Sequence, residues 1–555
     1  MLVQILRSFA AGMGTLLLGM TAYGQGAAPV VSCESLGQMA LSNTTITMAK
    51  TVEAGTFEAP KGFQPPSNVQ PASPGAPGGA APSSAQGGPP PSGSPAGPPP
   101  GGPGSDVKSL PAFCRIAATL SFASDSVIKI EVWMPLSNWN EKLYGIGSGG
   151  TAGDIKYQGL GDAIRQGYAG VTTDAGHDAF TDNGKLGFVI GHPERLKDYA
   201  YRANHEMTVK AKALITAFYG VGPKHAIFSG CSLGSMQAIN EAGRFPEDYD
   251  GVIAGALMNP IARFNAAQIW PAILVLKDPA KKLTTEKIAM IHEAALKACA
   301  TPVSEHDGAL EEPDRCHFDP AILLCKGDDA PNCLTAPQIE GVKQVYAGPV
   351  NPRTGEKIFV GPAPGAEGGF AQLTGSRPSY AAIEIFQNVV HQDPNWDWKT
   401  MDFDNDIALA DKVLGPLMYV TPEQLKPFFA RGGKLMLYDG WIDYHNPENV
   451  RLFYQDLQKT VGPQVKDSIR IFNVPGMGHC GGGVGCDTFD KVGTMSQWQD
   501  TGKAPEQING SKVVGGKVVR TRPLCAYPKM ARYKGTGDMD DTTNFVCAEK
   551  QLAGK

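Results

Sequence analysis

Hydrophobic and polar positions alternate in the first part of the chain in a way that predicts strands with one buried face. Shorter apolar runs, each bounded by glycine or other turn residues, predict buried strands farther along. Helices are expected at residues 204–219, where apolar positions recur at helical spacing, and at residues 234–245. Strands that alternate with helices predict an α/β fold with a mainly parallel sheet covered on both faces. The strands are expected at residues 117–122, 126–134, 143–146, 168–173 and 226–229.

The pattern loosens between residues 259 and 420, where short helical stretches, many prolines and two small cysteine loops replace it. Strand patterns return at residues 434–438 and 468–474. We therefore expect a discontinuous core built from residues 110–258 and 421–555. The intervening residues 259–420 would form a large lid domain inserted between two sheet strands.

Two segments near the N-terminus stand apart from this pattern. Arg7 precedes a short apolar stretch, and residues 22–24 have the small-x-small form of a cleavage site, so residues 1–24 are expected to be a signal peptide. Residues 60–105 consist almost wholly of Pro, Gly, Ser, Ala and Gln, a composition expected to be disordered because it buries too little apolar area. The export signal indicates a secreted or periplasmic protein.

Composition and cysteine content fit that location. With 42% hydrophobic residues and a formal charge of −5, the chain is expected to be soluble and globular, and no basic run suits a nucleic acid or a membrane surface as partner. Eleven cysteines fit an oxidising compartment, and their odd number leaves one over. Local spacing and the position of the Pro/Gly-rich segment favour four pairs: Cys33–Cys114, Cys299–Cys316, Cys325–Cys333 and Cys525–Cys547.

A candidate nucleophile lies between a predicted strand and a predicted helix. Residues 230–234 read Gly-Cys-Ser-Leu-Gly and match the Gly-x-Ser-x-Gly motif in the context that this motif requires. The glycines permit a sharp turn that lifts the hydroxyl of Ser232 out of the sheet. The alternative is an ordinary glycine-lined turn, but the context favours a catalytic serine.

A serine nucleophile needs a histidine base and an orienting carboxylate later in the chain. Of ten histidines, only His445 and His479 follow a plausible acid at a strand end. His479 lies in a glycine-rich loop directly after a strand, whereas His445 stands beside Asn-Pro and is interpreted as capping a helix. Asp439 and Asp443 both follow the strand at 434–438; we favour Asp443, which lies farther along the loop toward the histidine.

The cysteines beside the proposed nucleophile and base offer a fifth disulfide. Cys231 precedes Ser232 and Cys480 follows His479, so the two cysteines can reach disulfide distance if the serine and the histidine are hydrogen-bonded. Cys486 would then be the unpaired thiol.

An oxyanion hole needs two backbone donors. One is expected to be the amide of Leu233, directly after the nucleophile. The other should come from the glycine-rich loop at residues 145–153, where Gly150 is preferred and Gly149 is the second choice.

Two other function classes fit parts of the sequence. Gly145, Gly147 and Gly150 fit a dinucleotide fingerprint, with Asp174 near the position of the ribose-binding acid, but a disulfide-rich exported chain would rarely meet NAD. A non-catalytic protein that binds carbohydrate or phenolic compounds is the other alternative. An intact serine, histidine and aspartate set argues against it.

The candidate site residues resemble a known arrangement. Cys231 with Ser232, then Asp443, then His479 with Cys480 resemble the CS-D-HC motif of the tannase and feruloyl esterase family. The resemblance runs from about Cys114 to Cys547, and its specific stretches are residues 173–177, 244–246, 249–251, 474–480, 521–525 and 531–535.

The resemblance implies an α/β-hydrolase core with a lid, the five disulfides above, and a serine carboxylic ester hydrolase that forms an acyl-enzyme. The implied substrates are small esters of aromatic or phenolic acids, feruloyl or galloyl esters, including esters on plant cell-wall polysaccharide or on a polyphenol. A bacterial relative in this family hydrolyses mono(2-hydroxyethyl) terephthalate, a second candidate substrate. That branch resembles a lid helix with an arginine, and residues 380–390 here contain none.

Members of the family typically bind calcium in the lid, between the cysteines that match Cys299 and Cys316. Here only Asp307 stands at an expected acidic position, while Ala300 and Val303 occupy two others, so we expect an empty or weak site and no required cofactor. Residues 402–406 alternate acids but lack the glycine of a calcium loop, and are interpreted as a solvated turn. The lid aromatics that could hold a planar acyl group, or form core, are Phe264, Trp270, Phe370, Phe386 and Trp396.

Overall fold

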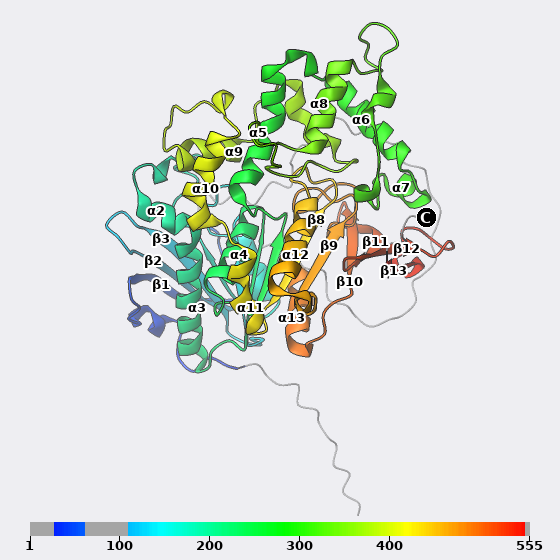
Figure 1. Cartoon of the computed structure of the whole chain (residues 1–555). Coiled ribbons are helices and arrows are strands. Elements are labelled where there is room, and N and C mark those ends of the chain that lie inside the picture. The colour runs from blue at the N-terminus through cyan, green and yellow to red at the C-terminus, as the bar shows by residue number, and fades with distance from the viewer. Residues whose placement is uncertain (1–26, 61–108, 550–555) are drawn as a thin grey trace, which may run out of the picture.

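The computed structural model describes residues 27–60 and 109–549 (Figure 1). The predicted signal peptide at residues 1–24 lies outside the described residues. So does the predicted disordered segment, 60–105, apart from residue 60.

A nine-stranded sheet forms the centre of the molecule, in the order β1-β2-β3-β5-β4-β6-β7-β8-β9. The strands β1, β2, β3 and β5 pair antiparallel, and the strands from β5 to β9 pair parallel. The expected, mainly parallel sheet is therefore present, with an antiparallel edge. The strands are β1 Thr44–Val52, β2 Phe113–Leu120, β3 Ile128–Pro135, β4 Lys142–Ile146, β5 Ala169–Thr173, β6 His225–Cys231, β7 Gly251–Gly255, β8 Lys434–Gly440 and β9 Ile469–Val474.

Helices cover both faces of this sheet, and the alternation of residues along each strand shows it. On β6, Phe228 packs in one core with α3 (Ala203–Tyr219), α4 (Leu233–Arg244) and α12 (Glu448–Val461). Its neighbour Ile227 packs on the opposite face with α1 (Tyr157–Arg165) and α13 (Lys491–Thr501). Because both faces are buried, the central strands are continuous apolar runs. None of the helices in the described ranges is long and apolar enough to cross a membrane.

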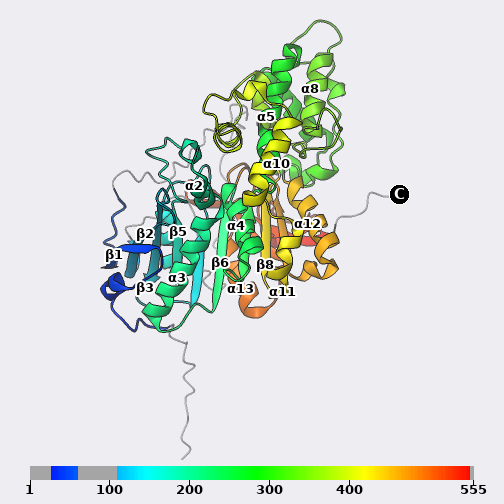
Figure 2. The same cartoon turned by 60° about the vertical axis from the view of Figure 1, so that its left-hand side comes forward.

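Residues 256–433, here called the insertion, separate β7 from β8. Figures 1 and 2 show its helices α5 and α8 above the central sheet. The insertion has an apolar core of its own around Leu283, Ile291 and Phe370. Its helices are α5 Ile261–Lys277, α6 Thr285–Ala298, α7 Pro302–Asp307, α8 Ala336–Ala347, α9 Tyr380–Glu384, α10 Asn405–Met418 and α11 Lys426–Ala430.

Two C-terminal hairpins and five disulfides complete the molecule. The hairpins pair β10 (Gln507–Val514) with β11 (Lys517–Cys525), and β12 (Lys529–Tyr533) with β13 (Phe545–Glu549). Cys486 is a free, buried cysteine. The disulfides coincide with the pairs expected from the sequence: Cys33–Cys114, Cys231–Cys480, Cys299–Cys316, Cys325–Cys333 and Cys525–Cys547.

Candidate active site

Ser232 lies in a strained turn between β6 and α4. Its φ of 61° and ψ of −123° are rare for a residue with a side chain. The backbone N–H of Ser232 donates to the carbonyl oxygen of Gly255 at 2.9 Å, and Ser235 N–H donates to the Ser232 carbonyl at 2.8 Å. These bonds hold the turn at the carboxyl end of the sheet, directly below the insertion.

The glycines around the serine are required by space. A Cβ on Gly230 would lie 2.2 Å from the carbonyl oxygen of Gly234, and a Cβ on Gly234 would lie 2.8 Å from that of Ser148. Both separations are shorter than van der Waals contact. The two glycines of the Gly-x-Ser-x-Gly motif are therefore needed because three backbone segments approach each other too closely for a side chain at these positions.

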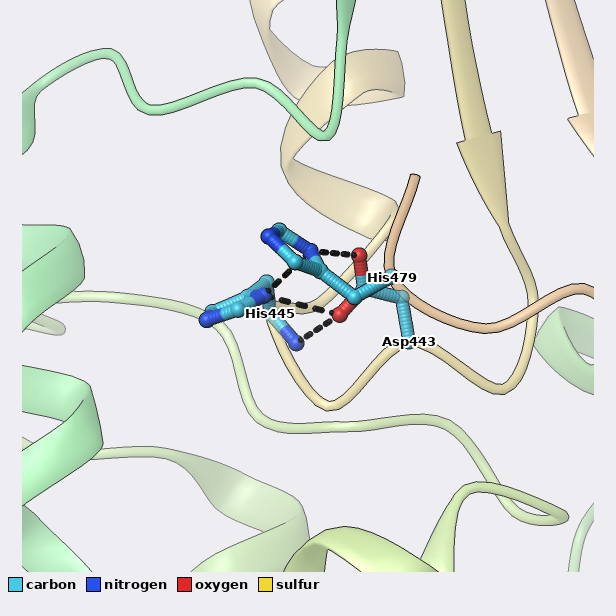
Figure 3. Close-up of side chains that lie close together, drawn as sticks. All are labelled: Asp443, His445 and His479. Atoms are coloured by element: carbon cyan, nitrogen blue, oxygen red, sulfur yellow. Dashed lines mark hydrogen bonds and ion pairs between the residues drawn. The ribbon is translucent and has the colours of Figure 1, made fainter. Parts of the chain in front are cut away.

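His479 and Asp443 form a hydrogen-bonded pair (Figure 3). Asp443 follows β8, His479 follows β9, and His479 Nδ1 lies 2.8 Å from Asp443 Oδ2. The Asp443 carboxylate is fully buried, whereas the His479 side chain keeps 19% of its surface exposed. The carboxylate thus orients the imidazole, part of which stays exposed.

The Cys231–Cys480 disulfide joins the serine turn to the histidine loop, with a Cα–Cα distance of 6.0 Å. Among the hydrogen bonds of residues 27–60 and 109–549, none joins Ser232 to His479; Ser232 Oγ instead lies 3.6 Å from Met258 Sδ. Catalytic hydrogen bonds are often long in free enzymes and tighten when substrate binds.

His445 is a site residue whose position the sequence interpretation got wrong. It does not cap a helix, because the residue before α12 is Pro447 and no side chain caps that helix. Instead His445 Nδ1 lies 2.7 Å from His479 Nδ1 and 2.9 Å from Asp443 Oδ1 (Figure 3). The sequence feature that could have indicated this position is that His445 lies two residues after Asp443.

The electrostatic surroundings differ between Asp443 and Asp439, the two aspartates that the sequence offers as the orienting carboxylate. Burial alone would raise the pKa of Asp443, but attraction to His445 and His479 holds that pKa well below its usual range. Burial and the neighbouring Asp443 charge raise the pKa of Asp439, which is also buried. The surroundings thus favour the charged form of Asp443 and disfavour that of Asp439. Burial lowers the pKa of His445.

The loop after β4 lies beside the serine turn. Ser148 N–H donates to the buried side-chain oxygen of Gln237 in α4 at 2.9 Å, which anchors this loop. Gly150 has a φ of 62°, and a Cβ on Gly149 or Gly150 would meet no atom within 4 Å. Leu233 is the first residue of α4, where backbone N–H groups lack partners within the helix.

Comparison with known proteins identifies the enzyme class. A family model described as tannase and feruloyl esterase matches residues 114–548. The chain belongs to this family. An uncharacterized esterase of Xanthomonas campestris pv. campestris is 33% identical over 93% of this chain and 91% of its own length. A probable feruloyl esterase B-2 of Aspergillus flavus is 32% identical over 72% of this chain and 80% of its own.

The fold agrees with this membership. The crystal structure of feruloyl esterase B from Aspergillus oryzae matches with a TM-score of 0.77 and 26% identity, covering 93% of this chain and 99% of that one. The protein is thus an α/β hydrolase and a carboxylic ester hydrolase, and both expectations are confirmed. The dinucleotide interpretation is wrong: Asp174 is buried and its Oδ1 accepts the N–H groups of Lys129 and Gly176.

The family's calcium site does not fit the residues of this chain. Both oxygens of Asp307 accept from Arg522 Nη2, at 2.8 and 2.6 Å, and Arg520 lies 3.4 Å away. Ala300 and Val303 offer no side-chain oxygen, so of the three expected positions only Asp307 has a carboxylate, and two arginines engage it. At residues 402–406, Asp404 pairs with Arg353 and the other two acids accept backbone N–H groups.

One other cluster has the residue types of a metal site. In the described ranges, Asp443, His445 and His479 are the group whose ligand atoms lie within 4.8 Å of one another. In a serine esterase, a pair such as Asp443–His479 supplies and orients the general base, so these residue types have an explanation that needs no metal ion.

Three of the five aromatic side chains considered for an acyl pocket are core: Phe264, Phe370 and Phe386 are at most 2% exposed. Trp270 and Trp396 are partly buried. Trp270 lines a small cavity of about 20 Å³ with Gln268 and Tyr444.

Proposed function

We propose that this esterase hydrolyses esters of aromatic phenolic acids, of the feruloyl or galloyl type, through an acyl-enzyme on Ser232. The observation that carries the mechanism is the Asp443–His479 pair, tied by the Cys231–Cys480 disulfide to a strained serine turn. The substrate class is supported by the family and by relatives named feruloyl esterase.

In the proposed mechanism His479, oriented by Asp443, takes the proton of Ser232 as Oγ attacks the ester carbonyl. The N–H groups of Leu233 and Gly150 stabilise the oxyanion. His479 then protonates the departing alcohol. A water activated in the same way hydrolyses the acyl-enzyme and restores the serine.

We also infer that the enzyme acts outside the cytoplasm, secreted or periplasmic. Five disulfides support this location, because such bonds persist in oxidising compartments. There the aromatic ester would be small and free, or attached to plant cell-wall polysaccharide or to a polyphenol.

The test is a hydrolysis panel on the oxidised protein: methyl gallate, methyl ferulate, chlorogenate and mono(2-hydroxyethyl) terephthalate, with Ser232→Ala as control. Serine-dependent turnover of the first three supports the proposal. Turnover of the terephthalate ester alone would show that the substrates are aromatic monoesters and not phenolic esters. Reaction of Ser232 with a fluorophosphonate tests the acyl-enzyme step, and an unlabelled serine would contradict it and favour a binding protein.

A further inference from the structure

His445 places a second imidazole on the carboxylate that orients the proposed base (Figure 3). Asp443 Oδ1 accepts the backbone N–H of His445 at 2.9 Å and lies 2.9 Å from the ring Nδ1 of the same residue. Asp443 Oδ2 faces His479. The two oxygens are thus divided between two histidines, which fixes the rotation of the carboxylate about its Cβ–Cγ bond.

This division matters for the base. An ionised carboxylate only accepts hydrogen bonds, so Oδ2 selects the tautomer of His479 that carries hydrogen on Nδ1. That tautomer leaves Nε2 of His479 bare and able to take a proton from Ser232. Without the His445 ring, Oδ1 would keep only the backbone N–H of residue 445, and Oδ2 would be held less firmly toward His479.

The insertion holds His445 in place. The imidazole stacks on Phe264 of α5, with ring centroids 4.7 Å apart and planes 28° apart. The adjacent Asn446 donates from Nδ2 to the carbonyl oxygen of Val360 at 2.6 Å. Asn449 donates to the carbonyl oxygen of Leu257 at 3.1 Å. The segment after Asp443 is therefore attached to the insertion at three points.

We propose that His445 is a positioning residue for ester hydrolysis: clamped by Phe264 of the insertion, it fixes Asp443 and thereby His479. The proposal rests on the proposed function of Ser232, Asp443 and His479. His445 is only 8% exposed and acts through Asp443 and through its own contact with the His479 ring, not on the substrate. The insertion would then orient the acid and the base as well as cover the serine.

The test compares His445→Phe, which keeps a ring on Phe264 but removes the nitrogens, with His445→Asn, whose Nδ2 can restore a polar contact to Asp443 Oδ1 in place of Nδ1. We expect His445→Phe to lower kcat by about 10- to 100-fold while KM changes less than about twofold, because misplacing a catalytic group has effects of this size. His445→Asn should recover most of that loss. Equal losses in both variants, or an unchanged kcat in His445→Phe, would overturn the proposal.

A matched control lies in α3. His205 Nδ1 is 2.6 Å from Asp248 Oδ2, and its ring stacks on Phe245 at 3.7 Å, so it is likewise paired with an aspartate and stacked on a phenylalanine, away from the serine. His205→Phe should leave kcat unchanged. In protein with ¹⁵N-labelled histidines, the Nδ1 resonance of His479 should move in His445→Phe and stay in His205→Phe. A resonance that does not move in His445→Phe would contradict the positioning role.

If His445→Phe does not fold, Phe264→Leu carries the test, because it removes the clamp and leaves every polar atom of the site. We expect kcat to fall by about three- to tenfold at unchanged KM, and an unchanged kcat would overturn the proposal. The Ser232→Ala variant distinguishes failure of the proposed function from failure of the role proposed for His445. Turnover that persists in Ser232→Ala would refute the proposed function. If turnover depends on Ser232 but His445→Phe has an unchanged kcat, only the role of His445 is refuted.

Discussion

At the scale of single residues, electrostatics distinguish Asp439, near the end of β8, from Asp443, in the loop that follows. Attraction to two histidines lowers the pKa of Asp443 despite its burial, whereas burial and the nearby Asp443 charge raise the pKa of Asp439. The two residues should therefore respond differently to the same substitution.

Asp443→Asn should lower kcat by about 10⁴-fold, because an amide no longer enforces the active tautomer of the base. Asp439→Asn should lower kcat by less than about tenfold, since an amide oxygen can still accept the Gly440 N–H. Steady-state kinetics on the panel ester measures both. A larger loss in Asp439→Asn would assign the orienting role to Asp439 instead.

Asp174 gives a second prediction at this scale. Burial raises the pKa of Asp174 to about 7. Because the folded state holds the proton more tightly than the unfolded chain, the stabilisation is complete below pH ~4 and is lost as pH rises through about 7. The loss is on the order of 4 kcal/mol.

Asp174→Asn keeps the Oδ1 acceptor for both backbone N–H groups and removes the titration. The free energy of unfolding, measured in denaturant at pH 4 and pH 8, should fall with pH in the wild type and much less in the variant. Parallel pH profiles would show that Asp174 is ionised in the fold at both values.

At the scale of elements, an ion pair connects α7 of the insertion to β11 of the C-terminal hairpin. Asp307 ends α7, and Arg522 of β11 is 6% exposed, so this ion pair is largely desolvated. A guanidinium group thus holds the carboxylate at the position where the sequence resemblance implied a calcium ligand. Removing the carboxylate leaves an uncompensated buried charge, which is strongly destabilising.

Asp307→Asn should reduce the free energy of unfolding by about 3 kcal/mol, and a chelator should leave the melting temperature of the wild type unchanged. Arg353→Ala is the control, since the Arg353 side chain is 70% exposed and such pairs contribute at most about 1 kcal/mol. A fall in melting temperature on adding the chelator would show that a metal ion stabilises the protein.

The strands that flank the site were predictable because their signal is local. The predicted strand at 468–474 and the observed β9 differ by one residue. The motif at 230–234 was recognisable because its glycines are required by the close approach of neighbouring backbone. The short β7, with glycine at both ends, and the four C-terminal strands were not predicted. His445 was misjudged because its partners, Phe264 and His479, come from distant parts of the chain.

At the scale of the whole molecule, one covalent bond spans the discontinuous core. Cys231 and Cys480 are 249 positions apart and enclose the entire insertion. In the chain-entropy model a loop of this length stabilises the fold by roughly 5 kcal/mol. The bond also holds the turn of Ser232 against the loop of His479.

Replacing Cys231 and Cys480 by serine should therefore lower both stability, by up to about 5 kcal/mol, and kcat. The control is the same change at Cys325 and Cys333, only 8 positions apart in the insertion, where roughly 3 kcal/mol is expected with kcat unchanged. Denaturant unfolding and kinetics measure both. Full kcat without the long bridge would show that packing alone aligns serine and histidine.

The same connectivity has a consequence for how the protein is made. Four of the disulfides join cysteines that follow one another directly along the chain, but the bond from Cys231 passes over four other cysteines before it reaches Cys480. A chain oxidised in order of synthesis would pair Cys231 with Cys299, and every later pairing would shift. Correct pairing then requires thiol–disulfide exchange after the second half of the chain has emerged. The yield of active enzyme should accordingly depend on the disulfide isomerase activity of the producing cell.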